Sequence, residues 1–320
     1  MLNGNLSKAD KIRKLLNEPE DVGLEYIANP EQYEKEVLSG YTMDVVPYRF
    51  GPLDQYCPAK MGELTCIIGH TNVGKTTVIL WMMAKLSQAG KKIVVYSAEN
   101  RISSLVKNVY RFVYGHDQWS KKELVRLRES FRFIKHERQF SYRDMLNQAT
   151  YLIDAGFDFD FFLIDPYNAL KIDNKSRLNT HDYHYEAIED MRVFTMTTGK
   201  SIFLNCHTVT ESQRAKADQN GRKPVPLDSD VEGGAKFPNK ADNTLVIHRQ
   251  IGSAIPNEKY ITEIHVRKVR NQEFGGEPTP YSEPIYIKYR MDRTGFDTVG
   301  STKIEDYKQV SWYDKESQPF

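Results

Sequence analysis

Residues 69–76 read Gly-His-Thr-Asn-Val-Gly-Lys-Thr and match the pattern G-x-x-x-x-G-K-[ST] at every fixed position. In such a loop the glycines let backbone N–H groups converge on phosphate. Lys75 supplies positive charge for the β- and γ-phosphates, and Thr76 offers a hydroxyl to Mg²⁺. The sequence therefore predicts a P-loop that binds ATP, or another nucleoside triphosphate, with Mg²⁺. The residues expected to form this site are Gly69, Thr71, Asn72, Val73, Gly74, Lys75, Thr76 and Thr77.

The elements on either side of the loop fit this interpretation. Leu64 to Ile68 is an apolar run typical of a buried strand, and Lys75 to about Ala89 has a helical pattern. A helix that begins at the loop adds the positive end of its dipole to the phosphate site. The alternative, a glycine-rich turn without a ligand, does not call for both elements.

Two carboxylates are predicted at the ends of neighbouring strands. Ile93 to Ala98 reads as a buried strand that ends in Glu99, which could orient or deprotonate a water that attacks the γ-phosphate, or could simply cap the next helix. The apolar run Phe161 to Ile164 ends in Asp165, which could hold Mg²⁺ through water, together with Thr76.

A further strand, Ser201 to His207, ends in a histidine at the same predicted edge. His207 could sense the γ-phosphate, or it could be a structural histidine. Asn243 to His248 is predicted as another strand, and Lys259 to Val269 alternates with Pro284 to Met291 like a hairpin. Residues 102 to about 133 read as helices whose aromatic side chains face the core.

Three groups of cations are candidate anion-binding residues. Lys268 and Arg270 are two positions apart, so on a strand they point to the same side and could reach one phosphate group. Two polar stretches, Lys171 to Tyr185 and Thr208 to Lys223, read as plain surface loops or as loops that reach a polyanion. Their candidate nucleic-acid residues are Lys171, Lys175, Arg177, Arg214 and Lys216.

The composition is that of a globular protein whose positive and negative charges nearly balance over the whole chain. The 320 residues include 44 Lys and Arg against 43 Asp and Glu, so any polyanion site must be local. The three cysteines lack C-x-x-C spacing, which argues for a reducing compartment and against structural zinc. Neither a signal segment nor a membrane-spanning run is evident. We expect a cytoplasmic protein, in the host cytoplasm if it is viral, that has no membrane partner.

From the P-loop onward, the order of these features resembles the RecA-like motor domain of ring-forming replicative helicases of the DnaB-like group. It is most similar to the phage T7-type and mitochondrial Twinkle-type helicases, because His207 stands at the strand end where others have Gln. The resemblance covers roughly residues 45–296. It implies an α/β fold with a mostly parallel twisted sheet flanked by helices. We expect an ATPase domain over residues 46–300 and a tail over 301–320. Residues 1–45 are charged, with helix-like pieces at residues 7–16 and 30–38. They are expected to form a helical leader packed on its own core, or an arm that docks on a neighbouring subunit.

The resemblance also implies a role for each candidate residue. Lys75 and Thr76 would be the Walker lysine and threonine, Asp165 the Walker B aspartate, Glu99 the catalytic glutamate and His207 the sensor.

The resemblance also implies roles for residues that are far from the P-loop in the sequence. Arg270 would be an arginine finger that completes a neighbouring subunit's site, assisted by Lys268, which implies a head-to-tail ring of six subunits. Arg249 and Tyr289 would hold the base, and the two polar loops would reach single-stranded DNA.

The sequence departs from that family before the motor region. No primase or zinc-binding segment precedes the P-loop, so loading could depend on a separate primase or loader protein. We therefore expect an ATP-dependent DNA helicase that translocates on single-stranded DNA during replication. Two alternatives stay open. One is a RecA-type strand-exchange ATPase, and the other is an ATP-gated loader or switch that does not translocate.

Overall fold

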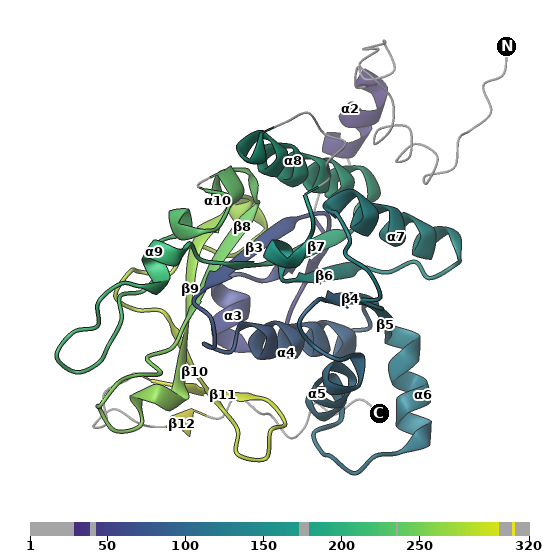
Figure 1. Ribbon diagram of the computed structural model, residues 1–320. Coiled ribbons are helices and arrows are strands. Elements are labelled where there is room, and N and C mark those ends of the chain that lie inside the picture. Colours follow the sequence, from purple (N-terminus) through teal and green to yellow (C-terminus); the bar gives the residue numbers. More distant parts are fainter. Residues whose placement is uncertain (1–28, 39–42, 173–178, 235, 301–308, 311–320) are drawn as a thin grey trace, which may run out of the picture.

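The computed structural model describes residues 29–38, 43–172, 179–234, 236–300 and 309–310. Within them, one ten-stranded sheet forms the centre of the molecule, as Figure 1 shows. Its strands, in spatial order, are β5 (Phe131–Ile134), β4 (Ile93–Ser97), β6 (Phe161–Asp165), β7 (Ser201–His207), β3 (Leu64–Gly69), β8 (Asn243–His248), β9 (Ile261–Val269), β10 (Ile285–Tyr289), β11 (Phe296–Val299) and β12 (Gln309–Val310).

The strands from β5 to β8 are parallel, and β9 to β12 continue the sheet in antiparallel pairing. The register pairs Gly69 with His207 and Ser97 with Asp165, so the ends of these strands are level with one another. We call the edge formed by the carboxyl ends of the parallel strands the carboxyl edge, and the opposite edge the amino edge. Ligands of open α/β sheets bind at the carboxyl edge.

Helices cover both faces of the sheet (Figure 1). On one face lie α3 (Gly51–Tyr56), α4 (Lys75–Gln88), α5 (Ile102–Tyr114) and α6 (Lys121–Ser130). On the other face lie α7 (Tyr142–Asp154), α8 (Thr180–Thr198) and α10 (Lys236–Lys240). Each face has its own apolar core, because strands that are covered on both sides bury all of their side chains.

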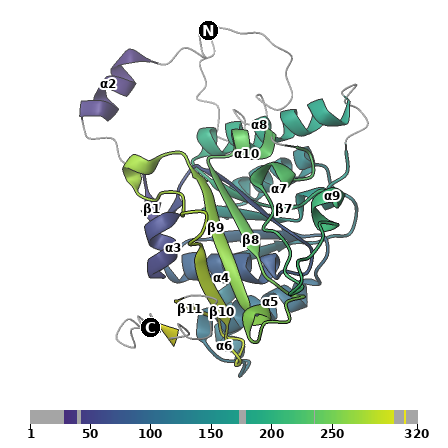
Figure 2. The ribbon, with the colours of Figure 1, turned by 90° about the vertical axis from the view of Figure 1, so that its left-hand side faces the viewer.

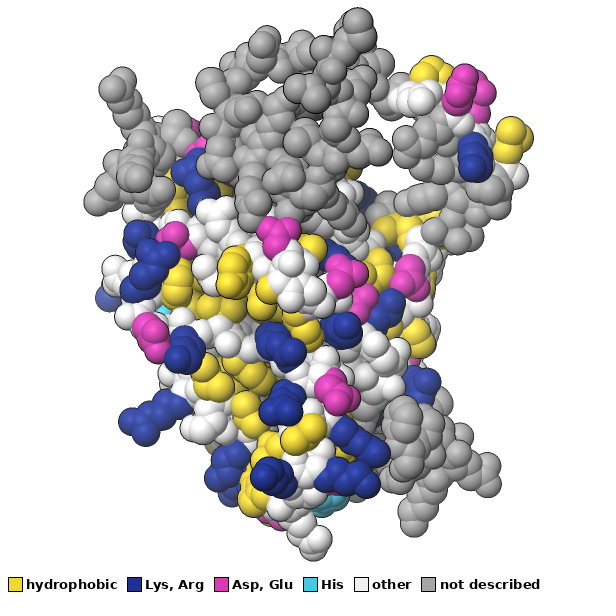
Figure 3. All heavy atoms as spheres, turned by 90° about the vertical axis from the view of Figure 1, so that its right-hand side faces the viewer, with side chains coloured by type: hydrophobic (Ala, Val, Ile, Leu, Met, Phe, Trp, Pro, Cys, Tyr) yellow, Lys and Arg dark blue, Asp and Glu magenta, His cyan; other side chains and the backbone are white. Residues whose placement is uncertain are grey.

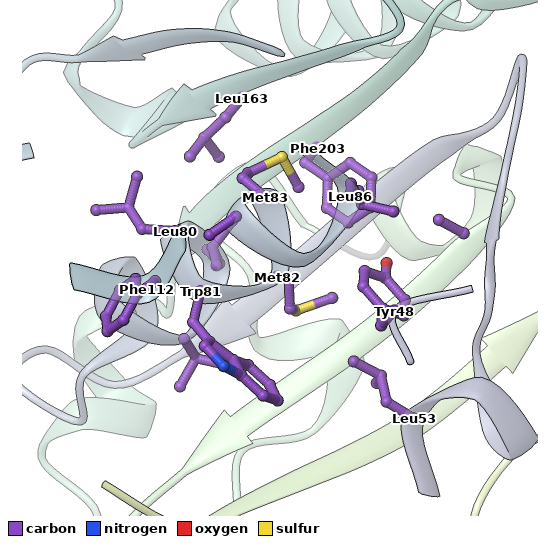
Figure 4. Close-up of a cluster of buried hydrophobic side chains, with 14 of the residues drawn as sticks. Tyr48, Leu53, Leu80, Trp81, Met82, Met83, Leu86, Phe112, Leu163 and Phe203 are labelled. Atoms are coloured by element: carbon purple, nitrogen blue, oxygen red, sulfur yellow. The ribbon is translucent and has the colours of Figure 1, made fainter. Parts of the chain in front are cut away.

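The helix that begins at the P-loop is the centre of one of these cores. Figure 4 shows the side chains of α4 packed against the sheet and against the segment before β3. Trp81 lies edge-on to Phe50, with ring centroids 4.8 Å apart, and 5.2 Å from Phe296. Burial of each large apolar side chain contributes about 1.5–3 kcal/mol to the stability. This packing fixes the N-terminus of α4, and therefore the P-loop.

Most of the expected elements are present, but two expectations are wrong. Residues 131–134, expected at the end of a helical region, form strand β5, because the alternating aromatic side chains of this segment pair along β4. The expected loop from Lys171 to Tyr185 ends earlier. Asn179 accepts a hydrogen bond from the backbone N–H of Asp182 and so starts α8 at Thr180.

The segment before the P-loop contains short elements. The strands β1 (Val45–Val46) and β2 (Ala59–Lys60) form a small antiparallel pair around α3. The expected helix at Pro30–Leu38 is confirmed as α2, which Figure 2 shows apart from the sheet and its covering helices. A helix was also expected at residues 7–16, which lie outside the described residues. No helix in the described part of the chain is long and apolar enough to cross a membrane.

Candidate nucleotide-binding site

The P-loop backbone has the conformation that its glycines make possible. Gly74 has φ 94°, in the left-handed region where a side chain is strained, and α4 begins directly after it. A Cβ at Gly69 would lie only 2.3 Å from the carbonyl oxygen of Ile247 on the adjacent strand β8. The backbone at Gly69 and at Gly74 therefore requires glycine, for lack of space at the first and for its conformation at the second.

Lys75 is a buried cation inside the loop. Its Nζ donates hydrogen bonds of 2.8 Å to the carbonyl oxygens of Gly69 and His70, and its side chain is 6% exposed. Burial lowers the pKa of Lys75 to about 8, although the nearby carboxylate of Asp165 acts in the opposite direction. The amine is still mostly protonated at neutral pH. A phosphate group at the loop would stabilise this charge further.

Asp165 is held at the end of β6 by three hydroxyl or amide donors. Thr76 Oγ1 lies 3.1 Å from both carboxylate oxygens, Ser97 Oγ donates at 3.2 Å, and the side-chain amide of Asn205 donates to Oδ1. Burial raises the pKa of Asp165 despite these hydrogen bonds. A hydroxyl and a buried carboxylate side by side are the oxygen ligands that Mg²⁺ takes together with phosphate and water, so the site fits this ion.

Within the described ranges, no group of three or more His, Cys, Asp or Glu side chains is placed to hold a metal ion.

Glu99 and His207 face each other across the carboxyl edge. Glu99 Oε1 lies 3.9 Å from His207 Nε2, and the Glu99 side chain is 53% exposed, so it is open to water. Burial, and then the positive charge of Lys75, lower the pKa of His207. His207 is therefore neutral at pH 7.

The backbone of His207 connects this edge to the turn before α10. The N–H of His207 donates to Asn168 Oδ1 at 2.7 Å, and Asn168 donates in turn to Glu232 at 2.8 Å. The N–H of Glu232 donates back to the carbonyl oxygen of His207 at 3.0 Å. Because these hydrogen bonds join the two residues, a displacement of His207 would also displace the segment around Glu232.

A second connection joins the P-loop to the loop after β7. His70 Nε2 lies 3.2 Å from Ser212 Oγ, and the Ser212 hydroxyl donates to Asp230 at 2.8 Å. Because the Ser212 hydroxyl gives its one proton to Asp230, it can only accept from His70. His70 therefore carries a proton on Nε2 and donates it to Ser212. Thr71 donates to Gln213 at 3.2 Å, beside it on the short helix α9 (Thr210–Gln213). We call these contacts the P-loop–α9 contact.

The residues that hold Asp165 and the P-loop in place were not predicted from the sequence. Asn205 had a signal, because it is a polar residue within an otherwise apolar strand. Ser97 gave the same signal in β4. Ser212 and Asp230 gave none, since serine and aspartate are ordinary residues of surface loops.

The two predicted polyanion loops differ in how they are held. Arg214 and Lys216 are exposed in the segment after α9. This segment packs on the loop between β8 and β9, where Lys223 and Gln250 exchange two hydrogen bonds of 2.9 Å. Lys171 lies 4.0 Å from Asp144. The remaining two candidates, Lys175 and Arg177, lie outside the described residues.

The two predicted base-binding residues lie in different places. Arg249 donates to the carbonyl oxygen of Asn72 at 3.0 Å, so the structure brings it to the P-loop. Tyr289 lies on β10, where its ring packs against Phe112 and Phe296, with centroids 6.4 and 5.1 Å away. Two strands, β8 and β9, separate β10 from the P-loop strand β3.

Lys268 and Arg270 lie at the amino edge, away from the P-loop of their own chain. Lys268 pairs with Thr244 near the start of β8, whose far end carries His248. The length of β8 therefore separates them from the carboxyl edge, about 16 Å at a rise of about 3.3 Å per residue. Arg270 forms an ion pair of 2.9 Å with Asp242.

Lys268 is fully engaged at this edge. Its Nζ donates to three backbone carbonyl oxygens in and just after α10, those of Pro238, Asn239 and Ala241, at 2.8, 2.9 and 2.7 Å. Arg270 also donates to a carbonyl oxygen of this helix, that of Lys240. Both cations thus reach the same side of the strand, as their spacing predicts.

Comparisons with known proteins add a family context to this geometry. No protein-family model matches the sequence. Among curated proteins, the chain is 24% identical over 241 residues to the chloroplastic/mitochondrial Twinkle homolog protein of Arabidopsis thaliana. The match covers 70% of this chain and 33% of that protein, so the chain spans about a third of its length.

Solved structures show the same fold at low identity. The ATPase domain of G40P superposes with a TM-score of 0.64 at 14% identity, covering 87% of this chain and 99% of that domain. A DnaB-like replicative helicase, solved with a view to its interactions with primase, gives 0.61 at 13% identity, with coverages of 87% and 67%. A KaiC-like protein, PH0186 of Pyrococcus horikoshii OT3, gives 0.53 at 14% identity, with coverages of 80% and 99%. The expected RecA-like fold, and the resemblance to DnaB-like and Twinkle-type proteins, are confirmed.

Proposed function

We propose that this chain is the ATPase motor of a replicative DNA helicase, which hydrolyses ATP to move along single-stranded DNA. The observation that carries the proposal is the separation of two sets of residues. Lys75, Thr76, Asp165, Glu99 and His207 meet at the carboxyl edge. The Lys268 and Arg270 pair lies at the opposite edge, out of reach of that site. Two halves of an ATPase site on opposite edges fit an assembly of identical subunits.

At the carboxyl edge, each residue has a distinct part in hydrolysis. Lys75 binds the β- and γ-phosphates, and Thr76 and Asp165 would hold Mg²⁺, which neutralises phosphate charge when bound. The exposed carboxylate of Glu99 orients the attacking water and accepts its proton. Neutral His207, 3.9 Å from Glu99, contacts the γ-phosphate side of the site and relays its state through Asn168 and Glu232.

A neighbouring subunit completes the site in this proposal. Arg270 of one subunit enters the nucleotide site of the next, and Lys268 assists it by holding α10 and the strand end in place. A contact of one edge with the opposite edge of a neighbour is heterologous, so it closes into a ring when the rotation permits. We propose a head-to-tail ring of six subunits. Arg249 and Tyr289 hold the base of the nucleotide.

The loops that follow β6 and β7 are the proposed DNA contacts in the centre of the ring. Arg214 and Lys216 are exposed after α9, which touches the P-loop directly. Lys171, Lys175 and Arg177 follow β6 in the sequence, and the proposal includes all three as DNA contacts. Contact through loops fits a chain of almost balanced charge, since affinity then depends on local phosphate contacts.

The segments around the motor also receive roles in the proposal. Residues 46–300 form the ATPase domain, residues 1–45 a leader that docks on a neighbouring subunit, and 301–320 a tail. Exposed apolar side chains on α2 support the docking role, since Val37 and Leu38 are 71% and 88% exposed. A separate primase or loader protein acts with the ring in this proposal, since the similar DnaB-like replicative helicase interacts with primase.

Steady-state ATP hydrolysis tests the function directly. The rate is measured with and without single-stranded DNA over a range of protein concentration. We expect it to rise steeply with both, because the complete site needs two subunits on one strand. The matched control is Glu99→Gln, which should keep Mg²⁺–ATP binding and lose hydrolysis by about 10² to 10⁴.

Two results would favour the alternatives. Slow hydrolysis that responds to neither DNA nor protein concentration would indicate an ATP-gated loader or switch. Open helical filaments in electron micrographs, instead of closed rings, would indicate a RecA-type strand-exchange ATPase. Unwinding of a forked duplex by closed rings would support the helicase.

A further inference from the structure

The face formed by α5, α6 and β5 has a charge that the whole chain lacks. Residues 101–143 contain eleven Lys and Arg against four Asp and Glu, whereas the full sequence is nearly balanced at 44 against 43. Figure 3 shows dark-blue side chains gathered over the lower part of this face, with apolar ones between them. The charge is therefore concentrated in one region. Such segregation creates a local field that attracts polyanions.

Most of these cations are not neutralised by neighbouring acids. Seven of them are exposed and form no ion pair with any carboxylate that the structure describes. These seven are Arg101, Lys107, Lys121, Lys122, Arg126, Arg128 and Arg132. On an ordinary solvated helix face, charges of both signs are interspersed. On this face positive charges outnumber negative ones by eleven to four.

An exposed aromatic ring lies among the cations. Trp119, in the loop between α5 and α6, is 46% exposed, and its ring is tilted against that of Tyr110, with centroids 4.8 Å apart. Lys107 Nζ and Arg111 Cζ lie over the ring, each 5.6 Å from its centre. A nearly half-exposed ring in contact with cations can stack a base while the cations contact its phosphates.

We propose that the α5–α6 face is a second binding site for single-stranded nucleic acid, separate from the loops at the carboxyl edge. β5 is the last strand of the sheet, and β4 separates it from β6, whose loop is a proposed DNA contact. The site goes beyond the proposed function, because ATP-driven movement needs only the loops. A strand bound here would run along the side of the subunit.

The observations favour single-stranded nucleic acid over an acidic protein partner. An acidic peptide would pair with the cations but would not need an exposed tryptophan between them. Lys122 and Arg126 are one helical turn apart on α6, so they lie on the same side of the helix with their Cβ atoms about 6 Å apart. Two charges so placed can contact successive phosphates of an extended strand.

The first experiment measures the salt dependence of binding to fluorescein-labelled oligo(dT), without nucleotide. The double variant Lys122→Gln/Arg126→Gln should reduce the slope of log K against log salt by about 1.4, because each phosphate contact with a single strand contributes about 0.7. Glu129→Gln, on the same helix, should strengthen binding. The matched control Lys35→Gln/Lys259→Gln removes two exposed cations that lie outside this face and should leave the slope unchanged.

The second experiment tests the ring of Trp119. Trp119→Ala should weaken oligo(dT) binding by about 5- to 150-fold, the effect of losing one stacked base, and Trp119→Phe should restore most of it. A structural role alone would give equal losses in thermal stability and in binding. Loss of stability without loss of affinity would overturn the proposal.

Photo-crosslinking distinguishes the strand bound by the loops from a second strand. Oligonucleotides containing 5-iodouracil are bound to a forked substrate, with the label first in one arm and then in the other, and crosslinked peptides are identified by mass spectrometry. We expect one labelled arm to crosslink to Trp119 and the other to residues near Arg214.

Three outcomes would overturn the second site. These are crosslinks only to the loops, tighter binding of duplex than of single strands by this face, or patch variants with unchanged affinity. Failure of the proposed function would be distinct, since it would appear as hydrolysis that single-stranded DNA does not stimulate while these binding results stand.

Discussion

The two edges of the parallel strands differ in how their charged groups are paired. At the carboxyl edge the charged groups are poorly neutralised. Burial lowers the pKa of Lys75 and raises that of Asp165, and Glu99 is open to water. At the amino edge the charges are satisfied within the chain, as Arg270 pairs with Asp242 and Lys268 donates to three carbonyl oxygens.

This contrast indicates where a ligand would stabilise the molecule. A nucleotide with Mg²⁺ supplies negative charge beside Lys75 and positive charge beside Asp165, so binding relieves both perturbed groups. At the amino edge burial also lowers the pKa of Lys268, but the partners of Lys268 and Arg270 lie within the chain. For Arg270 to act on a neighbour's nucleotide, its side chain must exchange the carboxylate of Asp242 for phosphate. The predictions below test this contrast.

The largest expected effect is that of Arg270→Ala. We expect DNA-stimulated hydrolysis to fall by about 10³ to 10⁵ with ATP affinity almost unchanged, because a finger acts on the transition state. The measurement is single-turnover hydrolysis together with equilibrium binding of a fluorescent ATP analogue. An equal loss of binding would contradict a role in trans.

Mixing two inactive variants provides a second test of whether Arg270 acts on the site of a neighbouring subunit. Lys75→Ala subunits lack a working P-loop but keep Arg270, and Arg270→Ala subunits have the reverse defect. Mixed assemblies should regain part of the activity, because some interfaces join an intact P-loop to an intact Arg270. If each edge served its own subunit, mixing would restore nothing.

How far the sequence could predict these edges depends on the kind of residue. The P-loop, Glu99, Asp165 and His207 were predictable, since each follows a run of buried strand residues and parallel strands end together. The P-loop–α9 contact was not, because it joins residues about 140 positions apart whose types are common in loops.

The amino edge was predictable only in part. The spacing of Lys268 and Arg270 places them on one side of a strand. What they contact depends on α10 and Asp242, which come earlier in the chain and carry no signature of their own. The roles of the two cations still depend on the resemblance and on the experiments above.

A pH effect on stability should come from the carboxyl edge. His248, at the end of β8, is 1% exposed, and burial lowers its pKa to about 4, although Glu263 opposes this and His70 and His265 add to it. The unfolded chain binds a proton near pH 6.5, and the folded chain does so only near pH 4. The free energy of unfolding should therefore fall as pH drops between these values, by about 3 kcal/mol.

Urea denaturation of the native chain and of His248→Gln, at several pH values, measures this contribution. Carboxylates also affect acid stability, but they are common to both proteins and cancel in the difference. The variant should show a shallower loss of stability between pH 6.5 and 4. Parallel curves for the two proteins would rule out His248 as the cause.

A smaller effect on stability is expected at the amino edge. Lys268→Met removes the donor for three carbonyl oxygens and should lower the free energy of unfolding by about 1.5–3 kcal/mol. Lys240→Met is the control, since the side chain of this lysine forms a surface ion pair with Glu189 and lies over the ring of Tyr185, and donates to no backbone carbonyl that the structure describes. If the two variants unfold at the same urea concentration, Lys268 does not stabilise this edge.

The smallest expected effect concerns the P-loop–α9 contact, which gives the carboxyl edge a second path to the loop that carries Arg214. Ser212→Ala removes the acceptor for His70 and the donor to Asp230. One neutral hydrogen bond contributes about 0.5–1.5 kcal/mol. The ratio of DNA-stimulated to basal hydrolysis should therefore fall by about 2- to 10-fold, with the basal rate unchanged.

Ser229→Ala, an exposed serine one residue before Asp230, is the matched control and should leave that ratio as it is. If Ser212→Ala also leaves it as it is, then His207 and its link to Glu232 are sufficient to couple the two regions. If the ratio falls, the P-loop itself communicates with the loop after β7. The carboxyl edge would then differ from the amino edge in a further respect, because its residues would both perform the hydrolysis and report its progress to the DNA.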